Sequence, residues 1–310
     1  MLMKIIGSAA GGGFPQWNCN FTFSRAVRFG KAGFPPRTQS SLAVSADGLR
    51  WVLFNASPDI RQQIAATCAL QPAADAPPRS SPVCAVVLTN ADVDHVAGLL
   101  SLRERQPFAL YATAEILGIL AENPIFNVLD PAIVPRRELI PDEPVEIMDG
   151  EERDTGVRIE PFIVAGKGPL YLEDASSEAP AHDEGETIGI RILSPEDRKS
   201  FFYIPACAAI TDELTKRLDG AAGVLFDGTF YTDDEMILAG VGEKTAARMG
   251  HSALSGAGGT LARLEDVAIA RRILVHINNT NPILDGNSAE RRAVEAAGWE
   301  VAEDGMEVAF

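Results

Sequence analysis

One short stretch of the chain gathers residue types that bind metal ions. In LTNADVDH (residues 88–95), the side chains of Asn90, Asp92, Asp94 and His95 fall within six consecutive positions. Carboxylate and imidazole groups are metal ligands, but one histidine and two carboxylates do not readily close a metal site alone. The same letters also fit a simpler structure, a helix that begins with Asp94 as its N-cap. The stretch therefore needs partners elsewhere in the chain before it indicates a site.

Candidate partners follow apolar runs much later in the sequence. Asp227 follows the run 224–226, and His276 follows the run 273–275. His251 stands just before a glycine-rich segment that leads into a helix, whereas His182 lies in an acidic loop without such a context. Any one of these histidines could be an ordinary buried residue with satisfied hydrogen bonds. Together, polar groups at several strand ends predict a site at one edge of a sheet.

The elements that must position these residues follow from hydrophobic patterns. Runs of apolar residues predict strands at 3–6, 41–44, 49–55, 83–88, 108–111, 201–204, 224–226 and 273–277. Helices are predicted at 60–66, 94–105, 114–121, 289–297 and after residue 255, with surface loops at 71–82 and 174–186. Strands precede helices in both halves, which predicts an α/β sandwich of mixed sheets with helices outside.

Composition excludes several classes of function. The 310 residues carry a formal net charge of −16, which argues against nucleic-acid binding and against attachment to an anionic membrane. We expect no signal peptide and no membrane insertion, because no apolar run is long enough. The four cysteines form no CxxC pair, which favours reduced thiols in the cytoplasm. The glycine run 7–13 lacks the spacing of a dinucleotide motif, so a tight loop is the better interpretation.

The ligand positions resemble those of the metallo-β-lactamase fold, in which His-x-His-x-Asp-His follows a core strand. Asp94 and His95 match the second half of that motif, and Asn90 and Asp92 replace its two leading histidines. By the same resemblance Asp227 is the bridging aspartate and His276 the last ligand histidine. His251 is similar to a histidine of the ribonuclease-Z-like branch.

Most of the chain resembles one family of this fold, the pyrroloquinoline quinone (PQQ) biosynthesis B proteins. The resembling segments lie within residues 5–285 and are GSAAGGGFPQWNC, PRTQSSLAVSADG, NASPDIRQQI, LTNADVDHVAGLLSLRE, LFDGT, DDEM, MGH and HINNTNPIL. The resemblance implies a single four-layer αββα domain over residues 1–310, a cytoplasmic location and a role in making PQQ. A homodimer is compatible with the sequence.

Two departures from the family pattern concern cysteines. The family shows WNCxCxxC, a cluster that looks like a structural zinc site, but here only Cys19 remains, with Phe21 and Ser24 at the other positions. One thiolate does not make a tetrahedral zinc site, so we expect no structural zinc. Phe21 and Phe23 are expected to provide apolar packing in its place. The family's Pro-Gly-Cys is Pro-Ala-Cys here, ending at Cys207.

The surviving ligands favour one divalent metal rather than two. The first metal of the fold would need the two missing histidines and a third in segment 162–169, which has none but contains Lys167. The second position keeps Asp94, His95 and His276, with Asp227 alongside and Asp92 as a less certain ligand. Two histidines and one carboxylate are typical of mononuclear non-heme iron(II) oxygenases, although Zn(II) can occupy the same ligands.

The family resemblance implies that this site uses O₂ to hydroxylate a small tyrosine-derived PQQ precursor. Asp94 and His251 would then be catalytic, with His251 moving a proton or orienting substrate. The candidates for contacts to the substrate or to the metal ligands themselves are Asn90, Lys167 and Cys207. Two alternatives stay open. One is a metal-dependent hydrolase, and the other is a carrier that helps deliver PQQ or its precursor to the periplasm.

Overall fold

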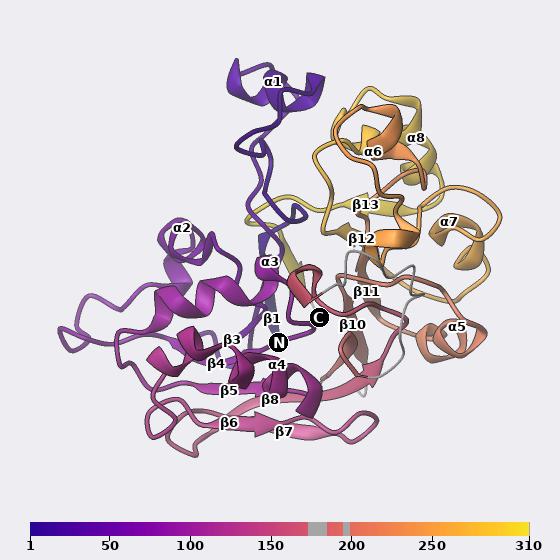
Figure 1. Cartoon of the computed structure of the whole chain (residues 1–310). Coiled ribbons are helices and arrows are strands. Elements are labelled where there is room, and N and C mark those ends of the chain that lie inside the picture. Colours follow the sequence, from indigo (N-terminus) through magenta and orange to yellow (C-terminus); the bar gives the residue numbers. More distant parts are fainter. Residues whose placement is uncertain (173–184, 195–198, 310) are drawn as a thin grey trace.

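Two mixed seven-stranded sheets form the centre of the protein (Figure 1). The computed structural model describes residues 1–172, 185–194 and 199–309. The N-terminal sheet contains, in spatial order, β14 (Glu307–Ala309), β1 (Leu2–Gly7), β2 (Ser41–Ser45), β3 (Trp51–Phe54), β4 (Val83–Val87), β5 (Ala109–Ala112) and β6 (Arg136–Glu138). The C-terminal sheet contains β13 (Trp299–Val301), β12 (Arg272–Val275), β11 (Gly223–Asp227), β10 (Ser200–Ile204), β9 (Ile188–Leu193), β8 (Asp154–Ile163) and β7 (Val145–Met148).

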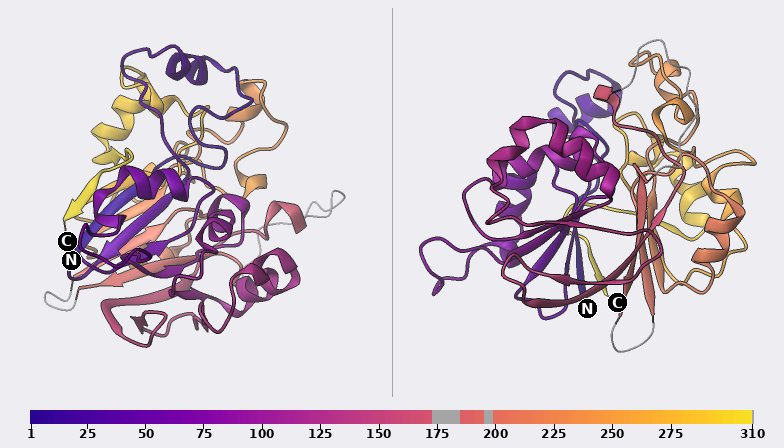
Figure 2. Two further views of the ribbon diagram at one scale, coloured as in Figure 1. Left: turned by 90° about the vertical axis from the view of Figure 1, so that its left-hand side faces the viewer. Right: turned by 60° about the horizontal axis from the view of Figure 1, so that its bottom comes forward.

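Helices cover the outer faces of both sheets, as the right-hand view of Figure 2 shows. The helices are α1 (Thr22–Arg28), α2 (Ile60–Ala66), α3 (Val93–Val96), α4 (Ala114–Glu122), α5 (Asp212–Leu218), α6 (Glu235–Leu238), α7 (Thr260–Arg263) and α8 (Ala289–Ala296). Short 3₁₀ helices lie at Cys68–Leu70, Ala97–Leu102, Pro124–Val128, Leu170–Leu172, Ala247–Met249 and Pro282–Leu284. Buried residues of α2, α3 and α4 pack on the N-terminal sheet, and those of α5 and α8 on the C-terminal sheet. This is the helix–sheet–sheet–helix order that the sequence predicts.

Strand β4 shows why the ligand-bearing loop begins where it does. Ala85 and Val87 point into the cluster between the two sheets, whereas Val86 and Leu88 point into the cluster beneath the helices. Both faces of the strand are therefore buried, which explains the continuous apolar run. The polar residues from Thr89 onward begin as this run ends, at the edge of the sheet.

The helix predicted at 94–105 differs from the structure. It is observed as α3 followed by the 3₁₀ helix Ala97–Leu102. Gly98 explains the tight packing here, because a Cβ at this residue would lie 2.1 Å from the carbonyl oxygen of Ser57. The amide of Gly98 also donates to the carbonyl oxygen of Ala56 (2.8 Å). This close backbone contact fixes the segment that carries His95 against the loop after β3.

The strand predicted at 273–277 ends earlier than expected. Its last residue in the structure is Val275, and His276 has a φ of 57°. A positive φ at a residue other than glycine is uncommon and cannot continue a strand. The turn therefore begins at the ligand residue itself. The other helices match more closely, since 60–66 and 289–297 are observed as α2 and α8 with at most one residue of difference.

The glycine run 7–13 is a tight loop between the two sheets. Ala9 forms isolated bridges to both Gln39 and Ile277, so the loop joins the N-terminal sheet to the turn after β12. A Cβ at Gly7 would lie 2.0 Å from the carbonyl oxygen of Gln39, and one at Gly11 would lie 3.4 Å from Oδ2 of Asp94. The run thus lets the backbone approach its neighbours, as the sequence predicts.

The segment around Cys19 is packed by aromatic side chains. The ring centroids of Phe21 and Phe23 are 5.1 Å apart, and those of Phe23 and Phe34 are 5.7 Å apart. The Cys19 thiol contacts Oδ1 of Asn279 at 3.3 Å. This thiol belongs to neither of the groups that could hold a metal among the described residues.

Within the ranges that the structure describes, no helix is long and apolar enough to cross a membrane. His182 and most of the acidic segment predicted as a loop at 174–186 lie outside those ranges.

Candidate metal centre

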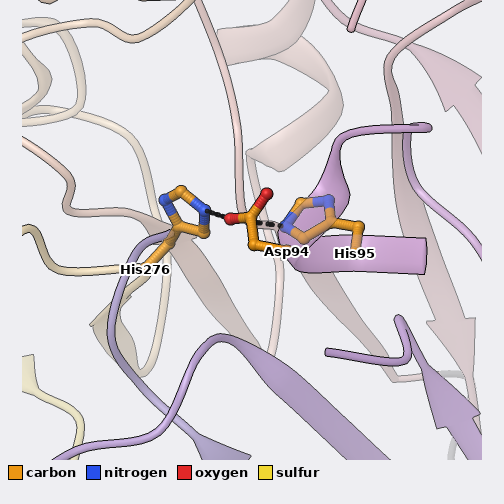
Figure 3. A group of neighbouring side chains, drawn as sticks. All are labelled: Asp94, His95 and His276. Carbon is orange, nitrogen blue, oxygen red and sulfur yellow. Dashed lines mark hydrogen bonds and ion pairs between the residues drawn. The ribbon is translucent and has the colours of Figure 1, made fainter. Parts of the chain in front are cut away.

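Asp94, His95 and His276 form the first of two groups whose ligand atoms lie within 4.8 Å of one another (Figure 3). They come from the N-terminal end of α3 and from the turn after β12, so the edges of both sheets contribute. Nε2 of His276 lies 3.0 Å from Oδ2 of Asp94, and Nε2 of His95 lies 3.9 Å from the same oxygen. The sequence separation between Asp94 and His276 is 182 residues, and the fold brings them together.

The hydrogen bonds of this group leave a position for a cation. Nε2 of His95 is buried and has no hydrogen-bond partner, which is costly unless an ion or water completes it. Burial lowers the pKa of His95 to about 4, against the opposing charge of Asp94, so this imidazole is neutral and able to ligate at neutral pH. Burial alone would raise the pKa of Asp94, but His95 and His276 hold it well below its usual range. The donor set therefore fits a divalent metal.

A buried pair behind His95 holds its ring in place. Oγ1 of Thr89 lies 3.5 Å from Nδ1 of His95. The Asn55 side chain in turn donates to Oγ1 of Thr89 (2.9 Å) and accepts from the Thr89 amide (2.9 Å). Asn55 has a φ of 65°, a conformation that asparagine tolerates better than most residues. Asn55 and Thr89 are thus positioning residues for the first group.

Asp227, His251 and His276 form the second group, which shares one histidine with the first. Oδ2 of Asp227 accepts from Nδ1 of His251 (2.8 Å) and from the Cys207 amide (3.0 Å). Oδ1 accepts from the amide (3.0 Å) and the hydroxyl (2.6 Å) of Thr229. A carboxylate offers about four lone-pair positions, and protein donors fill all of them here. These donors make Asp227 a positioning group for His251 and Thr229, and its role as a ligand stays a prediction.

Thr229 determines which nitrogen of His276 is free. Its single hydroxyl proton goes to Asp227, because a carboxylate only accepts. Nδ1 of His276, 2.8 Å from the same hydroxyl oxygen, must then donate to it. Nε2 of neutral His276 consequently carries a lone pair and faces Oδ2 of Asp94 at 3.0 Å. Two acceptors at this distance require a cation, either a proton or a metal ion. Burial would lower the pKa of His276, but Asp94 raises it. The raised pKa agrees with the need for a proton or a metal ion between Nε2 of His276 and Oδ2 of Asp94.

His251 is placed to handle protons beside the first group. Its Nδ1 donates to Asp227, so Nε2 is its available acceptor. The ring stacks on that of His276, with centroids 5.1 Å apart, and lines a cavity of about 410 Å³. The cavity wall also includes Asp94, His95 and His276. Burial would raise the pKa of Asp227, but the charge and hydrogen bond of His251 lower it, so Asp227 is an ionised carboxylate.

Asn90, Asp92 and Lys167 lie on the same cavity wall, and Asp92 belongs to neither of the two groups described above. Oδ1 of Asn90 accepts from the amide of Asp92 (3.0 Å). Oδ1 of Asp92 accepts from the amide of Leu170 (3.1 Å) and faces Nζ of Lys167 at 3.8 Å. Burial and the charge of Asp94 raise the pKa of Asp92, and Lys167 opposes them. The possible role of Asp92 as a ligand stays a prediction.

Cys207 contributes its backbone to the site. Its amide donates to Asp227, whereas the thiol contacts the carbonyl oxygen of Ala209 at 3.2 Å. Burial raises the pKa of this thiol far above its usual range, so it is not a thiolate. Sequence reasoning did not single out Thr229, Asn55 or Thr89. The signals available were their places in LFDGT and NASPD and at the end of β4, each next to a strand end.

Comparison with known proteins agrees with this site and fold. Residues 50–277 match the family model of the beta-lactamase superfamily domain. The chain is 53% identical over 302 residues to the coenzyme PQQ synthesis protein B of Methylobacterium sp. (strain 4-46), covering 97% of each chain. It is 48% identical over 310 residues to the protein of the same name from Xanthomonas campestris pv. campestris (strain B100), covering 100% of each.

Solved structures extend the comparison. A crystal structure of Zn(2+)-bound PqqB from Methylobacterium extorquens is 49% identical and covers 100% of both chains, with a TM-score of 0.94. A diphosphatase of the PhnP family covers 100% of this chain and 97% of its own at 20% identity, with a TM-score of 0.67, and shows the shared fold alone. The predicted metallo-β-lactamase fold is thereby confirmed. The chain belongs to the coenzyme PQQ synthesis protein B family, within the beta-lactamase superfamily.

Proposed function

We propose that this protein is a mononuclear non-heme iron enzyme that uses O₂ and an external two-electron reductant to hydroxylate a tyrosine-derived precursor in PQQ biosynthesis, with the second oxygen atom leaving as water. The observation that carries the proposal is the donor set of the first group. Asp94, His95 and His276 supply one carboxylate and two imidazoles around one point on the cavity wall. This combination with open positions is typical of iron(II) oxygenases. When bound, a ferrous ion supplies the one-electron chemistry that O₂ needs to react with an aromatic ring.

The residues around the ligands would bind and orient the substrate. A cavity of about 410 Å³ lies within the range of pockets for small molecules. Phe230, Met236 and Met249 give it apolar surface for an aromatic ring, whereas Lys167 and Lys244 bring positive charge suited to carboxylates. His251, fixed through Nδ1 by Asp227, would accept a phenol proton at Nε2.

The proposal is tested by reconstituting metal-free protein with Fe(II) without oxygen, then adding a two-electron reductant such as ascorbate, ¹⁸O₂ and a tyrosine-containing precursor peptide. We expect a product that is heavier by one ¹⁸O atom, formed with Fe(II) but not with Zn(II). Product without ¹⁸O, or equal turnover with Zn(II), would contradict an oxygenase. His251→Gln should reduce the rate while the bound iron stays, because His251 acts on the substrate rather than on the metal.

A metal-dependent hydrolase is the second candidate, since members of the superfamily are usually such enzymes and a Zn(2+)-bound relative is known. A two-metal hydrolase would need two ions about 3.5–4 Å apart, so a second bound ion would favour it. A carrier of PQQ or its precursor is the third. Continued PQQ production by cells that contain only Asp94→Ala protein would favour the carrier, because carrying needs no metal ligand.

A further inference from the structure

We infer that the ammonium group of Lys167 takes the place of a second metal ion and restricts this site to one. The inference concerns the part of the cavity wall next to the first group, where Asp92 stands two residues before the ligand Asp94. Asp92 and Asp94 line the same cavity, and a cation beside two such carboxylates reduces their mutual repulsion. The structure supplies that cation from the protein, because Nζ of Lys167 lies 3.8 Å from Oδ1 of Asp92.

The other polar atoms of this region are already engaged. Oδ1 of Asn90 is the acceptor for the Asp92 amide (3.0 Å), and Oδ1 of Asp92 also accepts from the Leu170 amide (3.1 Å). Asp92 belongs to no group of histidine, cysteine and acidic side chains that could hold a metal among the described parts of the chain. Asn90 and Asp92 thus offer a second ion few free donors, and Lys167 would repel it.

Lys167 is built into the cavity wall and is not a loose surface lysine. Its side chain is only 17% exposed, and Nζ also donates to the carbonyl oxygen of Gly168 (3.1 Å). A Cβ at Gly250, which has a φ of 81°, would lie 2.8 Å from Cγ of Lys167, so that glycine leaves room for the lysine stem. A Cβ at Gly166 would lie 2.2 Å from Oγ1 of Thr187. The close approach of Gly250 to the lysine stem therefore holds Lys167 in the cavity wall, with Nζ facing Asp92.

A fixed ammonium and a divalent ion differ in their consequences. The ammonium neutralises Asp92 without offering a coordination position, so water cannot be activated between two metals there. It can instead form a charge-assisted hydrogen bond to an anionic group of a bound molecule. One metal position and one permanent cation then lie side by side on the same cavity wall.

Counting bound ions tests the inference without any substrate. Metal-free protein is titrated with Zn(II), and the bound ions per chain are measured by equilibrium dialysis and elemental analysis. We expect one ion for the unchanged protein. In Lys167→His, which replaces the cation by a neutral ligand, a second ion should bind roughly tenfold tighter or more than any second ion in the unchanged protein, the scale of effects around metal ligands.

Lys244→Met is the matched control, because Lys244 lines the same cavity and its substitution removes the same charge. It should bind one ion. Two tightly bound ions in the unchanged protein, or equal second-ion binding by the Lys167→His and Lys244→Met proteins, would overturn the inference. Should Lys167→His fail to fold, anomalous diffraction from Zn(II)-soaked crystals of the unchanged protein decides. One peak beside His95 supports the inference, and a second peak on Asp92 overturns it.

The inference rests on the metal binding proposed above but not on the reaction. A protein that binds one ion yet adds no oxygen to the precursor would contradict the oxygenase and leave the role of Lys167 standing. A protein that hydroxylates the precursor with two ions bound would contradict the role of Lys167 and leave the oxygenase standing.

Discussion

The two carboxylates on either side of His276 are bonded very differently. Asp227 receives four protein donors and is fully buried, so its lone pairs are occupied. Asp94 faces the imidazoles of His95 and His276, and Nε2 of His95 has no hydrogen-bond partner. The difference teaches that two similar clusters of acids and histidines can have different roles, one binding the metal and the other positioning its ligands. We assign ligation to the Asp94 side and positioning to the Asp227 side.

Substitution of either carboxylate should give the largest difference between the Asp94 side and the Asp227 side, measured as retained metal. Asp94→Ala takes away one of three ligands, so we expect no metal to remain after gel filtration in metal-free buffer. Asp227→Asn keeps the ligands and should retain the ion. The measurement is elemental analysis of both variants and the unchanged protein after equal loading. Complete loss of metal from Asp227→Asn would show that Asp227 is itself a ligand and would break the comparison.

Thr229 connects the two sides, and its loss should have the next largest effect. Thr229→Val has a similar shape but no hydroxyl, so Nδ1 of His276 loses its acceptor and the tautomer with a free Nε2 is no longer favoured. We expect metal affinity to fall by about 10–100-fold, as for other residues that hold ligands. Competition with a chelator measures this. Thr229→Ser should restore most of the affinity, and a weak Thr229→Ser variant would mean that the methyl group matters instead.

The sequence predicted part of this division. Asp94 and His95 were found because they lie in the polar loop after the buried run of β4, and Asp227 and His276 because each stands at the end of an apolar strand. The roles of Asn55 and Thr229 could not be predicted in this way. Asn55 meets a residue 34 positions away, and Thr229 meets His276 47 positions away. No local periodicity encodes such pairs, since they exist only after the strand ends come together.

The fold was predictable to a similar extent. Apolar patterns predict the buried strands and the outer helices, but they do not predict where the α-helix around Asp94 ends. That length depends on Gly98, whose backbone packs on the carbonyl oxygens of Ala56 and Ser57. Likewise, the early end of β12 follows from the positive φ of His276, which periodicity does not show.

The donors around Asp227 also predict a difference in stability without metal. Asp227→Asn places an NH₂ group where an oxygen accepts two protein donors, which should lower the free energy of unfolding of metal-free protein by about 1–3 kcal/mol. Asp94→Asn should lower it less, because the protein surrounds Asp94 with fewer donors. Urea unfolding in the presence of a chelator compares them. An equal decrease in the free energy of unfolding of both variants would show that the two carboxylates do not differ in their contribution to stability.

Glu235 is another buried carboxylate, and we expect the smallest effect from its substitution. It accepts from the Tyr231 amide (2.7 Å) and contacts Oγ1 of Thr280 (2.5 Å), and no histidine or cation among its recorded partners stabilises its charge. Burial raises its pKa to about 7, opposite in direction to the shift of Asp227. The folded protein therefore keeps a proton on Glu235 that the unfolded chain has already lost at weakly acidic pH.

Stability should consequently fall as the pH rises through this range. Between about pH 6 and about pH 8 the Glu235 proton contributes a loss of about 1 kcal/mol in the free energy of unfolding. Glu235→Gln is uncharged throughout and should remove that slope, which urea unfolding at several pH values measures. If the variant keeps the full slope, another group titrates, and Glu235 is held ionised like Asp227. In that case the number of protein donors alone would not decide which buried carboxylate keeps its charge.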